Sequence, residues 1–163
     1  MLILKPFLNF CVITMAKFVI DENVFENAIT NQRPDGSPAH AEKIFAYKFF
    51  SSNDTMFINN AIKTKFIKNL PQKISIKYKS IYLDNHIIPS LKRIVFDSTK
   101  TNLIDGVKTQ FQGVKKCDTE FVGVTLQSNA TLVTADGDLK VAIAKDKLVS
   151  KCICNTVEEI LEK

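Results

Sequence analysis

Short apolar runs alternate along this chain with segments in which apolar residues recur at helical spacing. The runs predict strands at Lys17–Ile20, Met56–Ile58, Thr131–Thr134 and Leu148–Cys154. Helical spacing predicts helices over Val24–Thr30, Ala39–Phe50, Asn60–Leu70, Asp118–Ser128 and Asp138–Ala144, and a capping box at Thr156–Glu159 opens a terminal helix. Strands that alternate with helices in this way indicate an α/β fold with a central parallel sheet.

Other stretches are assigned on weaker patterns. Residues 72–110 fit either a strand or a helix; a helix is favoured, with Ser90–Asp97 helical. Residues 1–14 are apolar, but they are too short and too interrupted to span a bilayer. We expect Met15 to be the true start, residues 1–14 to be an upstream extension, and residues 15–163 to form a single domain.

Composition narrows the class of protein. With 163 residues, 45% hydrophobic and 24% charged, the chain matches a globular domain and excludes collagen-like and disordered proteins. Its four cysteines include no CxxC pair and it has only two histidines, so we expect no structural zinc. A chain of this length can form a core without disulfides, which predicts a reducing compartment, and the lack of a membrane-length apolar segment predicts a cytoplasmic location. The patterns GxGxxG, GxxxxGK(S/T) and GxSxG are absent, which argues against glycine-loop nucleotide binding and acyl-transfer hydrolysis.

Positive charge is concentrated in the middle of the chain. Residues 61–116 contain 12 Lys or Arg and 3 Asp or Glu, a local net charge of +9, whereas the rest of the chain carries −4. This asymmetry predicts an anionic partner for the middle segment. The alternative is a solvated lysine face, because nearly all the cations are lysines and specific phosphate readers are richer in arginine.

Acidic residues follow two predicted strands and open one predicted helix. Asp21 follows Phe18–Ile20, Asp136 follows Thr131–Thr134, and Asp118 begins the Asp118–Ser128 helix. Because the carboxyl ends of parallel strands open on one edge of a sheet, we expect these three carboxylates to converge there. Such an oxygen cluster, without histidine or thiolate, suits Mg²⁺ or Mn²⁺. The alternative is that Asp21 and Asp118 are helix N-caps and Asp136 a turn residue.

Three stretches resemble the PIN-domain family. Residues 18–25, FVIDENVF, are similar to its opening strand and first acid. Residues 117–126, CDTEFVGVTL, are similar to its third-acid helix, and residues 132–139, LVTADGDL, to its acidic strand end. A short terminal helix over residues 156–161 also fits the family, so the likeness covers residues 17–30 and 116–161.

The resemblance implies a three-layer α/β/α fold and an activity. The implied activity is a metal-dependent endoribonuclease, in which acids hold one or two Mg²⁺ or Mn²⁺ ions that activate water for RNA hydrolysis. The expected partner is single-stranded RNA, with no membrane; a homodimer and an antitoxin-type partner stay open. By position, the likeness assigns catalytic and metal-binding roles to Asp21, Asp118 and Asp136, an accessory metal-binding role to Asp138, and supporting roles to Asn23 and Thr134.

The sequence departs from the family at its second acid, which usually lies on the helix after the second strand. The corresponding helix, Asn60–Leu70, contains no acid, and Thr64 or Lys65 falls near the expected place. A lysine there would oppose metal binding and favour a phosphate. The candidate substitutes for the second acid are Glu42, Glu120 and Asp138.

Two other functions therefore stay open beside the nuclease. One is a catalytically impaired PIN-like protein that binds RNA or a protein partner without cleavage. The other is a small α/β interaction protein whose acids are helix caps. For the nuclease and for the impaired RNA-binding protein, the candidate RNA-binding residues are Lys63, Lys65 and Lys68 on the Asn60–Leu70 helix. Lys65 and Lys68 are expected to share a face of this helix.

Overall fold

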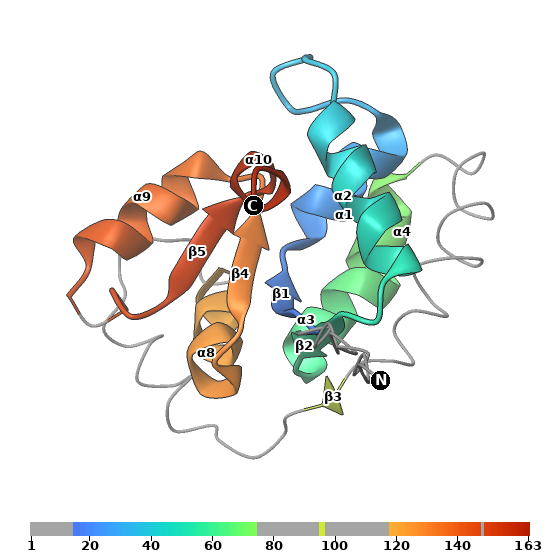
Figure 1. Cartoon of the computed structure of the whole chain (residues 1–163). Coiled ribbons are helices and arrows are strands. Elements are labelled where there is room, and N and C mark those ends of the chain that lie inside the picture. Colours follow the sequence, from blue (N-terminus) through green and yellow to red (C-terminus); the bar gives the residue numbers. More distant parts are fainter. Residues whose placement is uncertain (1–14, 75–94, 97–117, 148) are drawn as a thin grey trace, which may run out of the picture.

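The sheet is built from five short strands whose neighbours all run parallel. The computed structural model describes residues 15–74, 95–96, 118–147 and 149–163 (Figure 1). The strand order is β3-β2-β1-β4-β5. The strands are β1 (Lys17–Ile20), β2 (Thr55–Ile58), β3 (Val95–Phe96), β4 (Thr131–Thr134) and β5 (Ile153–Thr156). This parallel sheet with its helices confirms the predicted α/β class.

Helices connect and cover the strands. They are α1 (Glu22–Thr30), α2 (His40–Ser51), α3 (Asn60–Thr64), the π turn η1 (Lys65–Asn69), α4 (Leu70–Lys73), α8 (Asp118–Ser128), α9 (Gly137–Lys145) and α10 (Val157–Leu161). Helices α1 and α2 pack on each other, and α10 packs on α2. Helix α8 packs against β1, β2 and β4, and α9 against β4 and β5.

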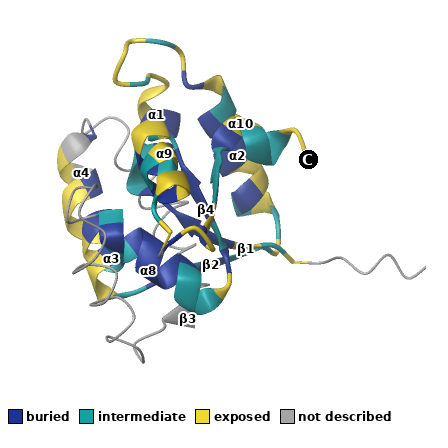
Figure 2. Ribbon diagram, turned by 90° about the vertical axis from the view of Figure 1, so that its left-hand side faces the viewer, coloured by how far each residue is buried: buried dark blue, intermediate teal, exposed yellow. Residues whose placement is uncertain are grey.

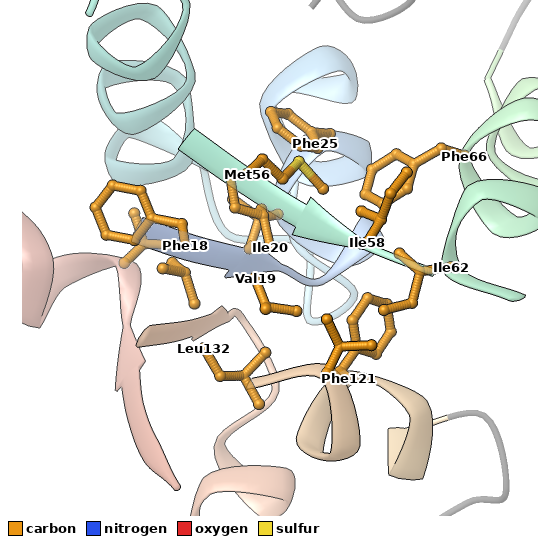
Figure 3. Close-up of a cluster of buried hydrophobic side chains, with 14 of the residues drawn as sticks. Phe18, Val19, Ile20, Phe25, Met56, Ile58, Ile62, Phe66, Phe121 and Leu132 are labelled. Atoms are coloured by element: carbon orange, nitrogen blue, oxygen red, sulfur yellow. The ribbon is translucent and has the colours of Figure 1, made fainter. Parts of the chain in front are cut away.

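Strand β1 is buried on both of its faces. The Phe18 ring meets Phe45 and Phe49 of α2 edge-on, with centroids 5.8 and 6.4 Å apart. The next residue, Val19, lies on the opposite side of the strand, near Leu132 of β4 and Phe121 of α8 (Figure 3). Because successive strand side chains alternate between faces, helices must cover both sides of the sheet. Figure 2 shows buried residues along the central strands and exposed residues on the outer sides of the helices.

Most predicted elements begin and end within a residue or two of the observed ones, but the edge strands differ. Residues Val95–Phe96, expected to be helical as part of Ser90–Asp97, form β3 and pair with β2. A β-branched residue beside an aromatic residue is typical of a strand, and pairing with β2 favours a strand over the expected helix. The last strand is Ile153–Thr156 rather than Leu148–Cys154, because it pairs in register with Thr131–Thr134.

The predicted Asn60–Leu70 helix is interrupted and longer than expected. It is α-helical to Thr64, passes through the π turn at Lys65–Asn69, and continues as α4 to Lys73. The expectation that the helix ends at Leu70, before Pro71, was therefore wrong. Proline is accepted in the first turn of a helical segment, and Pro71 lies in the first turn of α4. A π turn places hydrogen-bonded groups five residues apart, so it rotates the following side chains away from regular helical spacing.

Some expectations concern parts of the chain that the structure does not describe. The upstream extension of residues 1–14 and most of the favoured helix in 72–110 lie outside the described residues. Within the described ranges, no helix combines the length and the apolar character needed to cross a bilayer.

The aromatic packing of α2 predicts a large difference between two neighbouring ring residues. Phe49 is 8% exposed and packs against the rings of Phe18 and Phe25, whereas Tyr47 is 75% exposed. Phe49→Ala should lower the free energy of unfolding by about 3–5 kcal/mol, because it leaves a cavity in the core. Tyr47→Ala should change it by less than about 0.5 kcal/mol. Urea unfolding of both variants measures this, and equal losses would contradict the packing described above.

Candidate active site

The strand order reverses between β1 and β4, and the acidic residues follow these two strands. From β1 the chain moves outward to β2 and β3, and from β4 it moves the other way to β5. Ligands of open parallel sheets bind at such a reversal, outside the carboxyl ends of the strands. Asp21 follows β1 directly, and its backbone N–H donates to the Val133 carbonyl of β4 at 2.9 Å. Asp136 lies two residues beyond the end of β4.

The Asp21 carboxylate is held inside the protein by two side chains. It is 4% exposed, and its Oδ2 accepts hydrogen bonds from Thr134 Oγ1 and Asn23 Nδ2, both at 2.9 Å. Asp21 occupies the N-cap position of α1, yet its side chain makes no capping bond there. The alternative that Asp21 is a plain helix cap is therefore wrong.

The same two partners of Asp21 also fix the chain that leads to Asp136. Thr134 Oγ1 accepts a hydrogen bond from the Asp136 backbone N–H at 2.9 Å, and Asn23 Oδ1 accepts one from the Ala135 N–H at 3.1 Å. Asn23 and Thr134, both predicted as supporting residues, thus join the end of β1 to the end of β4. The two acids are set at one edge by a shared hydrogen-bond network.

Asp136 is a helix cap as well as an acid of this edge. Its Oδ1 accepts from the backbone N–H of Asp138 at 2.9 Å and of Leu139 at 3.2 Å, at the start of α9. Asp136 is therefore the N-cap of α9, and not the turn residue that the alternative expected. Both bonds use Oδ1, and among the described residues no hydrogen bond reaches Oδ2. One oxygen of this carboxylate therefore anchors the start of α9.

A pocket adjoins this network. It has a volume of about 390 Å³ and is lined by Asn23, Asn27, Pro34, Ala135, Asp136, Gly137 and Asp138. Two of the lining residues are acids, and Asn23, which also lines it, donates to the buried Asp21. The pocket therefore offers oxygen ligands from the loop between β4 and α9.

Asp118, the third predicted acid, is the first residue of α8. Because α8 leads by a short turn into the start of β4, its first residue lies toward the carboxyl edge of the sheet. In the part of the chain that is described, however, no group of three or more His, Cys, Asp or Glu side chains is arranged to hold a metal ion. The structure thus brings Asp21 and Asp136 to one network, and does not assemble all three acids into a single cage.

Glu22 is an acid of the site that the sequence pattern did not reveal. It lies next to Asp21 in the first turn of α1, where acids are common because they favour the helix dipole. Its Oε2 lies 3.4 Å from the ammonium nitrogen of Lys65, which is 9% exposed. The Lys65 ammonium also lies 4.2 Å from the centroid of the Phe121 ring. Adjacency to Asp21 was the one signal in the sequence that could have pointed to Glu22.

Burial dominates the electrostatics of Asp21. Loss of hydration raises the pKa of its carboxyl well above the ordinary value, and the negative charge of Glu22 and a hydrogen bond with it raise the pKa further. The hydrogen bond from Thr134 and the positive charge of Lys65 act in the opposite direction. The folded protein therefore disfavours the ionised form of Asp21.

Cys154 of β5 lies within the field of both acids. Burial raises the pKa of its thiol to about 12; Lys140 lowers this pKa, and Asp21, Glu159 and Asp136 raise it. Asp21, which follows β1, and Asp136, which follows β4, therefore both act on the Cys154 thiol. The thiol stays protonated at neutral pH, which makes it a poor nucleophile and a poor metal ligand.

The proposed substitutes for a second acid have other partners. Glu42 is 1% exposed and accepts two hydrogen bonds from Arg33, at 2.8 Å from Nε and 3.0 Å from the guanidinium end. Glu120 accepts from Asn59 Nδ2 at 2.7 Å, while Asn59 Oδ1 caps α3. Asp138 lines the pocket. Glu42 is thus a structural partner of Arg33, and Asp138 alone of these three borders the pocket beside Asp136.

The three candidate lysines differ in exposure, which corrects their expected arrangement. Lys68 is exposed and Lys63 half-buried, whereas Lys65 is buried. Lys65 and Lys68 therefore do not share a solvent face. Lys65 and Phe66 lie three and four residues after the buried Ile62 and so continue its face into the interior. The π turn that begins at Lys65 then shifts the residues after it, Lys68 among them, away from regular helical spacing.

Neither a protein-family model nor a curated protein sequence matches this chain.

The raised pKa of Asp21 predicts how stability depends on pH. The folded protein keeps the Asp21 proton to a higher pH than the unfolded chain does, so wild-type stability falls as the pH rises between the two pKa values. Asparagine does not titrate and escapes this loss. At pH 7 in EDTA, Asp21→Asn should therefore raise the melting temperature, and the gain should shrink toward pH 5.

Asp35→Asn is the matched control for this measurement. The pKa of Asp35 is lowered by its hydrogen bonds from Ser37, so its charge is favourable in the folded state. Asp35→Asn should therefore give no gain in melting temperature at pH 7. Equal behaviour of the two variants would contradict the electrostatic description of Asp21.

Proposed function

We propose that the chain is a PIN-like, metal-dependent endoribonuclease that hydrolyses RNA phosphodiester bonds at the carboxyl edge of its sheet. The observation that carries this proposal is the network in which Thr134 and Asn23 join the buried Asp21 to the loop of Asp136. The PIN-like assignment is supported by the position of the three similar stretches, which supply the end of β1, the start of α8 and the end of β4.

The residues at this edge fit one divalent ion. Mg²⁺ commonly binds through one or two carboxylates together with water and substrate phosphate. Asp21 and Asp136 would hold it, with Asp138 as an accessory at the pocket, and a bound cation would favour the ionised form of the buried Asp21. When bound, the ion supplies a water of lowered pKa and neutralises charge on the attacked phosphate.

The protein's own residues have separate parts in this scheme. Thr134 and Asn23 fix the orientation of Asp21, so its carboxylate need not reorganise when substrate arrives. Asp118 is the third acid proposed for catalysis, from the start of α8. Lys63 and Lys68 supply positive charge for the RNA backbone.

A second candidate function has its own supporting observation. The Lys65 ammonium lies 3.4 Å from Glu22 Oε2, and its charge also lowers the pKa of Asp21, so this edge already contains a cation that opposes metal binding. This favours the alternative of an impaired site that binds RNA without cleaving it. Cleavage and binding therefore need separate measurements.

The first test is cleavage of a labelled single-stranded RNA in Mn²⁺ and in EDTA. Wild type should cut in Mn²⁺ only. Asp136→Asn should lower the rate by at least about 100-fold, since it removes a proposed metal ligand. Asparagine caps helices about as well as aspartate, so α9 should stay folded.

The control variant is Glu162→Gln, which changes an exposed acid at the end of α10 and should cut at the wild-type rate. Full cleavage by Asp136→Asn, or cleavage that survives EDTA, would overturn the proposal.

The second test separates binding from catalysis. Lys63→Met with Lys68→Met should weaken RNA binding uniformly across sequences and reduce the slope of log K against log salt by about one unit for each phosphate that is no longer neutralised. Lys43→Met with Lys48→Met, the same charge change on α2, should leave the slope unchanged. Equal slopes in wild type and in both double variants would show that these lysines form only a solvated face. Binding that follows Lys63 and Lys68, with no cleavage in any metal, would establish the impaired-site alternative.

A further inference from the structure

Lys65 is a buried charge inside the proposed site. Lysine is rarely buried without a partner, because loss of hydration disfavours its charged form. Here the ammonium lies 3.4 Å from Glu22 Oε2 and 4.2 Å from the centroid of the Phe121 ring. These two partners come from α1 and α8, and α8 also carries the proposed site residue Asp118. An ion pair and a cation–π interaction together hold the charge in a defined place.

Helical spacing places Lys65 on the buried face of its helix. Lys65 and Phe66 lie three and four residues after the buried Ile62, and Phe66 packs edge-on against Phe25 (Figure 3). The helix changes from α to π geometry at Lys65, where the N–H of Leu70 donates to the Lys65 carbonyl five residues earlier. Single π turns inside α-helices occur often at functional sites.

We propose that the Lys65 ammonium is a built-in cation of the acidic site, which pairs with Glu22 beside Asp21 and thereby weakens the attraction of this edge for a divalent ion. The inference rests on the proposed metal site. The geometry supports it: the ammonium lies 3.4 Å from Glu22 Oε2, and Glu22 directly follows Asp21 in the first turn of α1. Lys65 is thus a positioning residue that acts through Glu22.

The inference makes Glu22 a latent metal ligand. Removing the Lys65 charge leaves the Glu22 carboxylate half-buried without this cation, next to an acid that is already held in place. Glu22 then adds both charge and oxygen atoms for a metal ion. Removing Glu22 instead takes this carboxylate away from the Lys65 ammonium. The positive charge of the ammonium then repels a metal ion at Asp21.

Mn²⁺ binding by the full chain, measured by calorimetry and by the loss of free-ion electron paramagnetic resonance signal, tests this. Wild type should bind one Mn²⁺ per chain. Lys65→Met should bind at least tenfold more tightly, and Glu22→Gln at least tenfold more weakly. The double variant Glu22→Gln with Lys65→Met should return to near wild-type affinity. Lys68→Met, which removes an exposed charge from the same helix, should match wild type.

The outcomes separate this inference from the proposed function. Wild-type affinity in both Lys65→Met and Glu22→Gln, or an equal gain in Lys68→Met, overturns the role of Lys65 and leaves a metal-dependent nuclease intact. Binding by Lys65→Met with none by wild type supports the role of Lys65 and rejects the metal-dependent nuclease. Absence of Mn²⁺ binding in every folded variant rejects both. If Lys65→Met does not fold, Glu22→Gln alone decides, since it keeps the lysine.

Discussion

The hydrogen bond from Thr134 to Asp21 connects the two strands on which the rest of the site depends. It joins the end of β1 to the end of β4, where the order of the sheet reverses. Since the Thr134 hydroxyl also accepts from the Asp136 N–H, one side chain sets both the buried acid and the loop that begins α9. A buried carboxylate with fixed partners is costly for folding but needs little reorganisation in a reaction.

A second polar cluster stabilises the wall of the pocket. Arg33 forms a paired hydrogen bond with the buried Glu42 and also bonds Glu158 of α10, which ties the loop before α2 to two helices. Asn27, which lines the pocket, donates to the same Glu42 at 3.3 Å. These interactions raise the pKa of Arg33, with the hydrogen bond to Glu42 as the largest cause. The loop that contributes Pro34 to the pocket is therefore held by charge as well as by packing.

The interior of this protein contains more charge than its fold requires. Asp21, Glu42 and Lys65 are all buried, and removing an ionisable side chain from water costs free energy in folding. Glu42 has a clear structural partner in Arg33. Asp21 lies at the carboxyl edge, joined to the pocket through Asn23, and Lys65 lies close enough to act on its charge. Buried charges of this kind lower the stability of the folded protein. They are typical of functional sites, where fixed polar groups serve binding or catalysis.

The sequence by itself determined the alternation of strands and helices, because apolar spacing follows the period of each element. It also located Asp21 and Asp136 at strand ends, which a parallel sheet brings to one edge. It did not determine β3, since Val95–Phe96 is a strand through its pairing with β2, which lies far from it in the sequence. Nor did it predict the burial of Lys65 or the part played by Glu22, because both depend on how α1, η1 and α8 pack together. Local spacing fixes the elements, whereas the pairing of buried charges is decided by which elements the tertiary structure brings together.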